Sequence, residues 1–422
     1  MEKINKFIGH IFDKEFSINF IWRFLQLAGK QGVVFIMFLI SAKYLTPYDF
    51  GQFSYSMAII ILLGIFCDFG ISTAVSKYVS ESYKENIGNS KKAMSSLMIV
   101  ISLFSLTLII FSYFIFKIFF ASNLYFFKYL FLLLFLIPVT SLFDGYYRGI
   151  KQFKKPSFIV LSAGIISLSI SFFLISHFGI LGAMLSQLVF YLNLFLFFII
   201  SDKFSVNFDF GLVKNILRYS LIIGFANIGT ILFLKSFQII AGHMGYALEV
   251  GYFELIYRIT QVLVIIFSIA GQVIAVDNIF HYSNDKRYLF RFYKKTLVLS
   301  FSLSIIFTIL SFLIAPYFIE IFFSNYYTSE FILILKINLF VLPLVLVEAF
   351  IANGFITPLG DAKILAYSII MASLISFFGM ILISNFTDDF KFIFYWFMAI
   401  LAIVSVIKII WYSRRLKLLT KQ

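Results

Sequence analysis

The sequence predicts an all-α membrane protein with about 12 transmembrane helices in two pseudo-symmetric lobes of six, with both termini cytoplasmic. Composition is the first basis for this prediction. Of the 422 residues, 61% are hydrophobic and only 13% are charged, whereas about 25% are charged in a soluble domain. Apolar runs of about 20 residues recur along the chain, and each can cross ~30 Å of hydrocarbon. An internal repeat predicts the two lobes.

The apolar runs are separated by short connections, none of which could hold a separate folded domain. They predict an N-lobe at 20–200, a cytoplasmic linker at 201–217, a C-lobe at 218–412 and a basic tail at 413–422. Residues 1–19 place apolar side chains at helical spacing with lysines mostly between them, which predicts an amphipathic helix lying in the membrane interface. A frayed polar tail is the alternative. The twelve predicted spans are 20–42, 53–76, 94–116, 126–147, 157–176, 179–200, 218–240, 251–275, 296–316, 331–352, 364–385 and 391–412.

Basic residues predict the orientation of these spans. Of the 34 Lys and Arg residues, 26 fall in the N-terminal segment, the even-numbered connections and the C-terminal tail, against four in the odd-numbered connections. Lys and Arg collect on the cytoplasmic side, so we expect both termini to be cytoplasmic. Topology also accounts for the net charge of +14, and no basic stretch interleaved with aromatics indicates nucleic acid.

Two pairs of motifs indicate a duplication. "YDFGQF" (48–53) opens the second span and "LEVGYF" (248–253) opens the eighth, with the acid, Gly and Phe in register. Pro138 and Gly149 bracket the end of the fourth span, as Pro343 and Gly354 bracket the end of the tenth, with Asp144 and Glu348 inside the brackets. Because six is an even number, the repeats insert with the same orientation and should be related by an axis along the membrane normal.

The eighth span carries polar side chains on one helical face. Glu254, Arg258 and Gln261 lie at positions i, i+4 and i+7. A charged group at the bilayer centre costs at least about 2.5–3.5 kcal/mol, so such groups are candidates for function. Similar stripes occur in two other spans: Asn227, Lys235 and Gln238 in the seventh, and Arg23, Gln26 and Lys30 in the first.

In the duplication, spans one and two correspond to spans seven and eight, so their polar stripes predict one shared cavity. Lys30, Lys235, Arg258, Glu254, Gln261 and Gln26 are the candidate substrate-binding residues. Fixed cations in a poorly solvated cleft suit phosphate, which Arg binds through two hydrogen bonds and Lys as a point charge. We therefore expect an anionic headgroup as cargo.

Each candidate also has an alternative interpretation. Glu254 and Arg258 could neutralise one another as an i,i+4 pair, and Lys235 could extend to the headgroups. Asp68 in the second span is a candidate for coupling to H+ or Na+, or an acceptor for a neighbouring Ser or Tyr. The single cysteine, the scattered histidines and the lack of a phosphate-binding Gly loop indicate no catalytic residue, metal or cofactor.

Three stretches carry a family resemblance. "AKYLTPYDFGQFSY" (42–55), "DFGISTAVSKYVSE" (68–81) and "GHMGYALEVGYFELIYRI" (242–259) resemble the polysaccharide transporter family, the Wzx-type O-antigen and teichoic-acid flippases of the multidrug/oligosaccharidyl-lipid/polysaccharide exporter (MOP) superfamily. Thr46 stands where this family usually has Gly, and Arg258 falls at its common basic position.

The resemblance implies an alternating-access flippase for an oligosaccharide linked by diphosphate to a polyprenol, such as a lipopolysaccharide O-antigen unit. It implies a multi-pass protein of a prokaryotic plasma (inner) membrane, driven by an ion gradient or the membrane potential. Its expected partners are the lipid-linked oligosaccharide, membrane lipids, H+ or Na+, and other polysaccharide-assembly proteins. Two alternatives stay open: a drug/cation antiporter of the same superfamily, disfavoured because deep bases outnumber deep acids, and a membrane polysaccharide polymerase, disfavoured by the short external connections.

Overall fold

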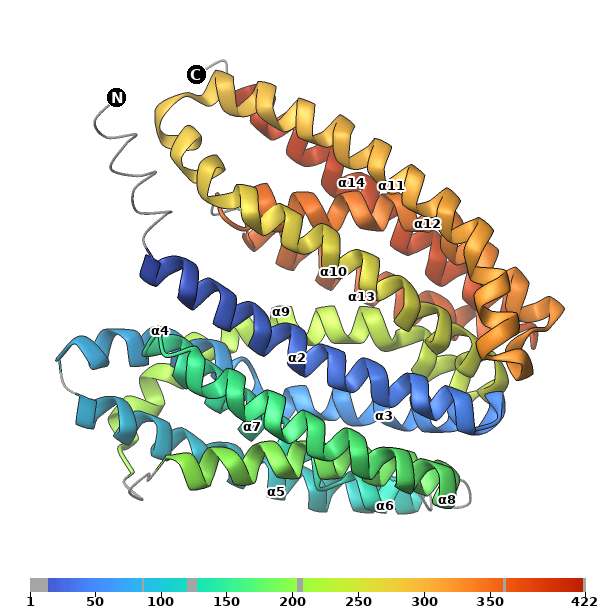
Figure 1. Ribbon diagram of the computed structural model, residues 1–422, viewed down its shortest axis with the longest axis horizontal. Coiled ribbons are helices and arrows are strands. Elements are labelled where there is room, and N and C mark those ends of the chain that lie inside the picture. Colours follow the sequence, from blue (N-terminus) through green and yellow to red (C-terminus); the bar gives the residue numbers. More distant parts are fainter. Residues whose placement is uncertain (1–13, 86, 120–126, 203–207, 360–361, 420–422) are drawn as a thin grey trace. The chain divides into compact units, whose positions relative to one another are not determined.

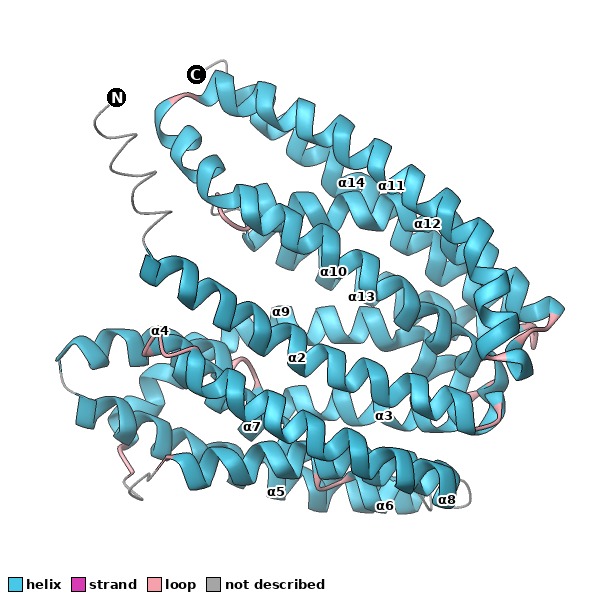
Figure 2. Ribbon diagram, viewed as in Figure 1, coloured by secondary structure: helices cyan, strands magenta, loops and turns pink. Residues whose placement is uncertain are grey.

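The computed structural model describes residues 14–85, 87–119, 127–202, 208–359 and 362–419. Within these ranges the chain forms helices and no strand (Figures 1 and 2). The α-helices are α2 (Lys14–Tyr44), α3 (Pro47–Asp68), α4 (Ile71–Glu85), α5 (Ile87–Phe119), α6 (Phe127–Leu130), α7 (Leu133–Gly149), α8 (Lys154–Ser201), α9 (Phe210–His243), α10 (Ala247–Asn284), α11 (Lys286–Phe322), α12 (Ser329–Ile351), α13 (Ala362–Ser384) and α14 (Phe390–Leu419), with a 3₁₀ turn at Ser324–Tyr326 and a π-helix at Ala352–Ile356.

Ten helical segments of the described chain are long and apolar enough to cross a membrane. One of them, α8, has 48 residues, which would extend ~72 Å at 1.5 Å per residue. It instead folds back at Gly179, whose φ of 55° lies in the left-handed region. Asn193 Nδ2 donates to Ser167 Oγ at 3.0 Å, although 26 residues of straight helix would separate them by ~39 Å. The segment α8 is therefore a hairpin of two spans.

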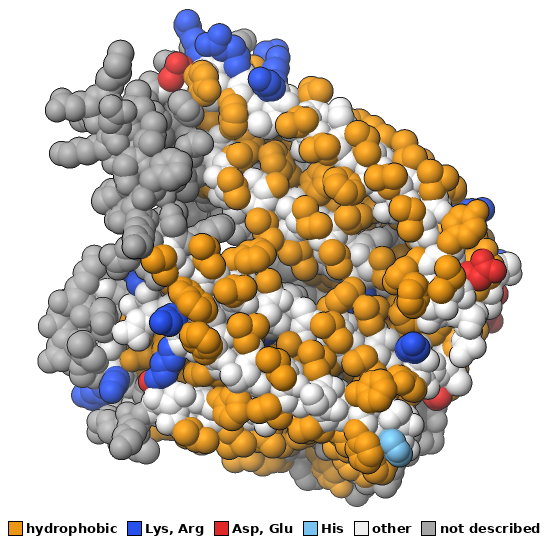
Figure 3. Space-filling view, viewed as in Figure 1, with side chains coloured by type: hydrophobic (Ala, Val, Ile, Leu, Met, Phe, Trp, Pro, Cys, Tyr) orange, Lys and Arg blue, Asp and Glu red, His pale blue; other side chains and the backbone are white. Residues whose placement is uncertain are grey.

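The predicted all-α membrane fold is confirmed, and the protein is a multi-pass membrane protein. The fourth predicted span corresponds to α6 and α7, and the second to α3 with α4. Hydrophobic side chains cover most of the coloured surface in Figure 3, where charged side chains are sparse. Such a surface suits contact with lipid rather than water.

The chain divides into two compact units. The first comprises the described residues up to Leu45 together with Ser56–Ile228, and the second comprises Thr46–Tyr55 and Gly229–Gln422 as far as they are described. The start of α3 thus belongs with the second unit, and the first part of α9 with the first, which differs from the predicted division at 200 and 218.

Three predicted boundaries differ from the helices. Of the predicted N-terminal amphipathic helix, residues 1–13 lie outside the described chain, and 14–19 form the first turns of α2. Within the predicted linker, α9 begins at Phe210. In the predicted tail, α14 continues to Leu419. Composition locates the apolar centre of a helix, but hydrogen bonding extends the helix into polar sequence beyond it.

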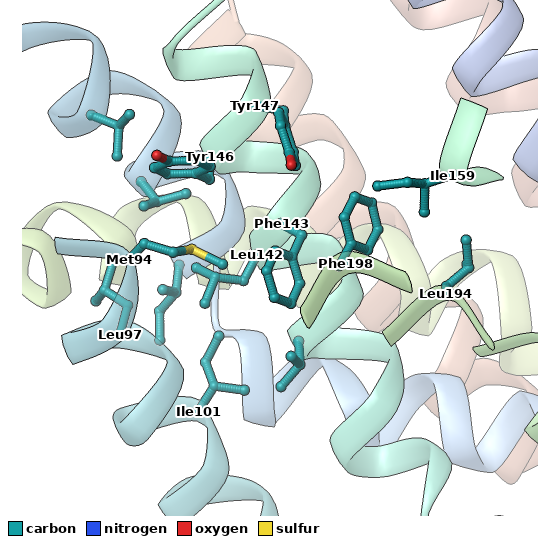
Figure 4. Packing of buried hydrophobic residues seen from close by; sticks show 14 of the residues in the cluster. Met94, Leu97, Ile101, Leu142, Phe143, Tyr146, Tyr147, Ile159, Leu194 and Phe198 are labelled. Carbon is teal, nitrogen blue, oxygen red and sulfur yellow. The ribbon is translucent and has the colours of Figure 1, made fainter. Parts of the chain in front are cut away.

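The first unit has a core of aromatic and aliphatic side chains from α2, α4, α5, α7, α8 and α9. Figure 4 shows part of this core, where Phe143 of α7 stacks on Phe198 of α8 with ring centroids 4.8 Å apart. The helix α2 packs along α8, and α4 packs against α5 and α7. In the second unit, α10 and α11 pack against α12, which also contacts α14.

Asp209, in the connection before α9, binds that helix to α5. Its carboxylate accepts from the Leu212 backbone N–H at 3.1 Å and pairs with Lys92 at 3.1 Å. The Leu212 N–H and, next, the Lys92 ammonium hold the pKa of Asp209 below its ordinary value. An acid at this position also interacts favourably with the N-terminal end of the helix dipole.

The repeated glycines contact each other within the second unit. A β-carbon at Gly51 of α3 would lie 1.6 Å from the Ala247 carbonyl oxygen, and one at Gly251 of α10 would lie 2.2 Å from the Pro47 carbonyl oxygen. The contact is reciprocal, as a local twofold axis between equivalent segments requires. It supports the predicted duplication and gives a physical reason for Gly at both positions, since the backbones touch.

Thr46 caps the start of α3 through its side-chain hydroxyl. The Asp49 backbone N–H donates to Thr46 Oγ1 at 3.1 Å, and Thr46 Oγ1 donates to Asp49 Oδ2 at 2.8 Å. Pro47 occupies the first helical position, where its missing N–H costs nothing. Thr46 therefore supplies a cap that Gly at this position could not.

Replacing Gly51 by Ala is expected to lower the melting temperature of the purified protein, because the new methyl group must push α3 away from the Ala247 carbonyl. We expect a loss of about 1–3 kcal/mol, as for other overpacked sites. Gly64→Ala, in the same helix and with no atom within 4 Å of the added β-carbon, is the matched control and should melt like the parent. Equal melting temperatures for the two variants would contradict the close contact.

Candidate functional site

Glu254 is the centre of a buried polar cluster in the second unit. It lies on α10 with 1% of its surface exposed. Arg258 Nε, one turn later, donates to Glu254 Oε1 at 2.7 Å. From α9, Lys235 Nζ lies 3.6 Å from Glu254 Oε2, and Gln238 Nε2 donates to the same oxygen. The predicted stripes of these two helices thus meet at one carboxylate.

This cluster has two cations and one carboxylate, so it keeps a net charge of +1. Lys235 Nζ also lies 5.3 Å from the centroid of the Tyr257 ring, where the electron-rich face favours a cation. Gln238 is fully buried, and its Oε1 has no hydrogen-bond partner in the described structure. An unpaired buried acceptor is costly and is available to a donor that enters the cluster.

The predicted pairing of Glu254 with Arg258 is therefore present, but Glu254 also pairs with Lys235, which is buried. The alternative in which Lys235 extends to the headgroups does not describe this structure. Gln261, the third member of the predicted stripe, is half-buried. It lies about one turn beyond Arg258 on α10, and its part in binding stays a prediction.

A second cluster lies in the first unit around Asp144 of α7. Arg23 of α2 forms a bidentate pair with this carboxylate, through an ion pair to Oδ1 and a 3.2 Å bond from Nη2 to Oδ2. Gln26 is buried, and its Nε2 donates to Asp144 Oδ1 at 2.9 Å. The side-chain carbonyl oxygen of Gln26, Oε1, accepts from Arg23 Nη1 at 2.8 Å. Gln26 is thus held in place by two charged neighbours.

Lys30 lies two turns beyond Arg23 on the same helix. Its Nζ is 5.7 Å from the centroid of the Tyr191 ring of α8, and it forms no ion pair with a carboxylate of the described chain. Because Asp144 pairs with Arg23, this cluster also carries two cations against one acid. Lys30 is the cation that its surroundings leave unpaired.

Asp144 was not among the residues that the stripes predicted. It stood out only as an acid within the bracket formed by Pro138 and Gly149. Because it lies on the fourth span, outside the four spans expected to line the cavity, the stripes gave no reason to choose it. The signal that could have found it is the cost of an acid inside an apolar span.

Asp68, the predicted coupling residue, caps the turn between α3 and α4. Its two carboxylate oxygens accept from the backbone N–H and the hydroxyl of Ser72, each at 2.9 Å. The next two residues, Phe69 and Gly70, have positive φ values of 39° and 78°. These contacts favour the alternative in which Asp68 accepts bonds from a neighbouring Ser, and its coupling role stays a prediction.

A third buried ion pair was missed from the sequence. Lys408, which was counted with the bases of the C-terminal tail, lies inside α14, and its Nζ is 2.8 Å from Glu348 Oε1 of α12. Its carboxylate partner is 60 residues away in the sequence, so spacing along one helix could not indicate the pair. Besides Lys30, Lys235 and Arg258, the count of bases leaves Lys336 inside a predicted span, and this residue of α12 is exposed.

The two polar clusters belong to different units. Gln26 and Lys30 lie in the first unit, and Lys235, Glu254 and Arg258 in the second. Their convergence on one shared cavity therefore stays a prediction. Among the described residues, no group of three His, Cys, Asp or Glu side chains is arranged to bind a metal ion.

Comparisons with known proteins agree with this fold. The profile of the family described as "polysaccharide biosynthesis protein" matches residues 18–275. No curated protein sequence matches the chain.

Several solved structures are similar. An inward-facing multidrug resistance transporter of the MATE family of the MOP superfamily has 15% identity and a TM-score of 0.70, over 95% of this chain and 99% of that one. The eukaryotic MATE transporter AtDTX14 has 13% identity and a TM-score of 0.62, over 96% and 98%. A MOP superfamily transporter from Pyrococcus furiosus, described by the reverse polarity of its binding pocket, has 16% identity and a TM-score of 0.60, over 95% of each chain.

Proposed function

Because the chain belongs to the polysaccharide biosynthesis protein family and has the fold of MOP-superfamily transporters, we propose that it is a flippase. Its cargo is an oligosaccharide linked by diphosphate to a polyprenol, such as an O-antigen unit. The protein carries this cargo across the plasma membrane of a prokaryote by alternating access, driven by an ion gradient or the membrane potential. It acts as a transporter and not as an enzyme.

The observation that carries this proposal is the excess of cations in both polar clusters, of which the Glu254 cluster is buried and the Asp144 cluster half-buried. Lys235 and Arg258 share one carboxylate in the second unit. In the first unit, Asp144 pairs with Arg23, and Lys30, two turns further along α2, has no carboxylate partner among the described residues. A diphosphate supplies the negative charge that such groups require, and it accepts charge-assisted hydrogen bonds from Arg and Lys. A single neutral sugar would not balance either cluster.

The Tyr191 ring adds a reason for a sugar next to the phosphate. The ring is half-buried and lies beside the Lys30 ammonium. Aromatic rings offer an apolar face to the C–H side of a sugar, while the cation binds an adjacent anionic oxygen. Lys30 and Tyr191 therefore suit a cargo with an anionic group and a sugar close together.

The second candidate, a drug/cation antiporter, is favoured only by the fold, which resembles multidrug transporters. A cationic drug needs carboxylates that are free to pair with it. Glu254 and Asp144 are each already paired with at least one base. This pairing disfavours the antiporter.

The test is transport by the purified protein in proteoliposomes. A polyprenyl-diphosphate oligosaccharide with a fluorescent sugar is placed in both leaflets, and a membrane-impermeant quencher reports the fraction that becomes accessible. We expect protein-dependent flipping of this lipid and no uptake of ethidium under the same ion gradient. Uptake of ethidium without flipping of the lipid would favour the antiporter and overturn the proposal.

A further inference from the structure

A basic pocket lies where α7 ends and α8 begins, away from the polar clusters on which the proposed function rests. Its volume is about 590 Å³. Its lining includes Lys151, Gln152, Lys154, Lys155 and Phe158. These residues form the connection after the fourth predicted span, which the distribution of bases places on the cytoplasmic side. The pocket therefore lies at the depth of the inner-leaflet headgroups.

Two of the three lysines have no carboxylate partner among the described residues. Lys155 Nζ pairs with Asp202 at 2.6 Å and donates to the Ser201 carbonyl at 2.7 Å. Lys151 and Lys154 are exposed and form no ion pair with a described carboxylate. The pocket thus offers two unpaired ammonium groups to an anion.

The shape of the pocket is fixed by its surroundings. Lys151 has a φ of 56°, a left-handed conformation that is uncommon for a residue with a side chain. The backbone N–H groups of Lys151 and Gln152 donate to the carbonyls of Arg148 and Tyr147, at 3.3 and 3.1 Å. Asp202, which follows the lining residue Ser201, accepts from Tyr147 as well as from Lys155. These hydrogen bonds hold the turn at Lys151 and connect α7 to both ends of α8.

Two aromatic side chains, Phe153 and Phe158, line the pocket, and Trp22 lies next to it through its contact with Phe158. The Trp22 and Phe158 rings are in contact, with centroids 5.1 Å apart, and Lys154 Nζ lies 5.9 Å from the Trp22 ring. Trp and Tyr are enriched where the hydrocarbon meets the headgroups, because their rings suit both environments. An apolar wall beside unpaired ammonium groups matches a lipid, whose acyl chains and phosphate are joined in one molecule.

We propose that this pocket binds an anionic phospholipid of the inner leaflet, with its phosphate on Lys151 and Lys154 and its glycerol and upper acyl chains against Trp22 and Phe158. The site is independent of the transported cargo. Basic residues at the membrane surface attract anionic lipids with about 1 kcal/mol per charge, and a formed pocket adds selectivity for one bound molecule.

The test is lipid retention by the full-length protein, measured by native mass spectrometry with phosphatidylglycerol or phosphatidylcholine as the probe. For the Lys151→Gln/Lys154→Gln variant, we expect phosphatidylglycerol affinity to fall about tenfold and the weaker phosphatidylcholine binding to stay unchanged. Both lysines are exposed, so the variant should keep the parent melting temperature. Lys155 is left intact because its ion pair holds α8 in place.

The control variant is Lys286→Gln/Arg287→Gln, which removes two exposed bases at the start of α11 on the same predicted side. It should retain phosphatidylglycerol like the parent. An equal loss in the control would show diffuse attraction to the surface and overturn the pocket. Full displacement of the lipid by inorganic phosphate at millimolar concentration would show a site for a soluble anion and would also overturn the proposal.

Discussion

Replacing Arg258 by Ala is expected to reduce flipping of a polyprenyl-diphosphate oligosaccharide by about 100-fold, because in the proposed site its guanidinium makes the bidentate contact to the diphosphate. Hydrogen bonds to charged groups contribute about 1.5–3 kcal/mol each, so the loss of two accounts for this factor. Arg258→Lys keeps the charge but not the planar pair of donors, and we expect an intermediate loss of about tenfold. Initial flipping rates in proteoliposomes measure both.

The control for Arg258 is Lys336→Ala, which removes an exposed base from α12 in the same unit. It lowers the net charge by the same amount and should flip the lipid like the parent. Arg258→Ala also leaves Glu254 paired with Lys235, so the variant should fold and reach normal levels in the membrane. Parental flipping by Arg258→Ala at equal protein level would remove Arg258 from the binding site.

The transmembrane fold was predictable because hydrocarbon imposes a simple requirement on composition and length. The repeat around Gly51 and Gly251 was visible in the sequence as well. The structure adds the reason for Gly at both positions, which is the reciprocal backbone contact. The hairpin in α8 was anticipated as two spans separated near Gly179. Helix boundaries were less predictable, because α9 and α14 extend beyond their apolar centres.

The candidate site was only partly predictable. Spacing placed Glu254 and Arg258 on one face, since i,i+4 residues are neighbours on any helix. It could not show that Lys235 shares the same carboxylate, because that contact joins two helices. For the same reason, neither the pairing of Asp144 with Arg23 nor that of Glu348 with Lys408 could be read from the sequence. Such pairs depend on packing between distant segments.

Replacing Glu254 by Gln is expected to destabilise the empty protein and to strengthen its binding of anions. Gln keeps the shape of Glu, but its single carbonyl oxygen can accept from only one of Gln238 Nε2 and Arg258 Nε, which bond to different oxygens of Glu254. Lys235 and Arg258 also lose their counter-ion. Removing one partner of a buried ion pair costs about 3–5 kcal/mol, so the melting temperature should fall. Inorganic pyrophosphate should restore it, because a ligand that binds only the folded state stabilises in proportion to RT ln(1 + [L]/Kd).

This rescue distinguishes a binding role for Glu254 from a purely structural one. In the parent, Glu254 pairs with Lys235 and Arg258, so a diphosphate that binds these cations as proposed must first displace the carboxylate. The Glu254→Gln variant lacks this competing carboxylate, so we expect its Kd for pyrophosphate to be at least tenfold lower than that of the parent. A gain of ~1.4 kcal/mol in binding free energy is enough for this factor.

Glu348→Gln is the matched control, since it also removes an acid that pairs with a lysine within the second unit. It should lower the melting temperature, but pyrophosphate should not restore it to a comparable extent. Only one cation, Lys408, loses its partner in this variant, and a single lysine cannot bind a diphosphate as Lys235 and Arg258 together can. If pyrophosphate stabilises both variants equally, or neither, the Glu254 cluster is a structural ion pair, and the cationic site proposed for the cargo in the second unit is lost.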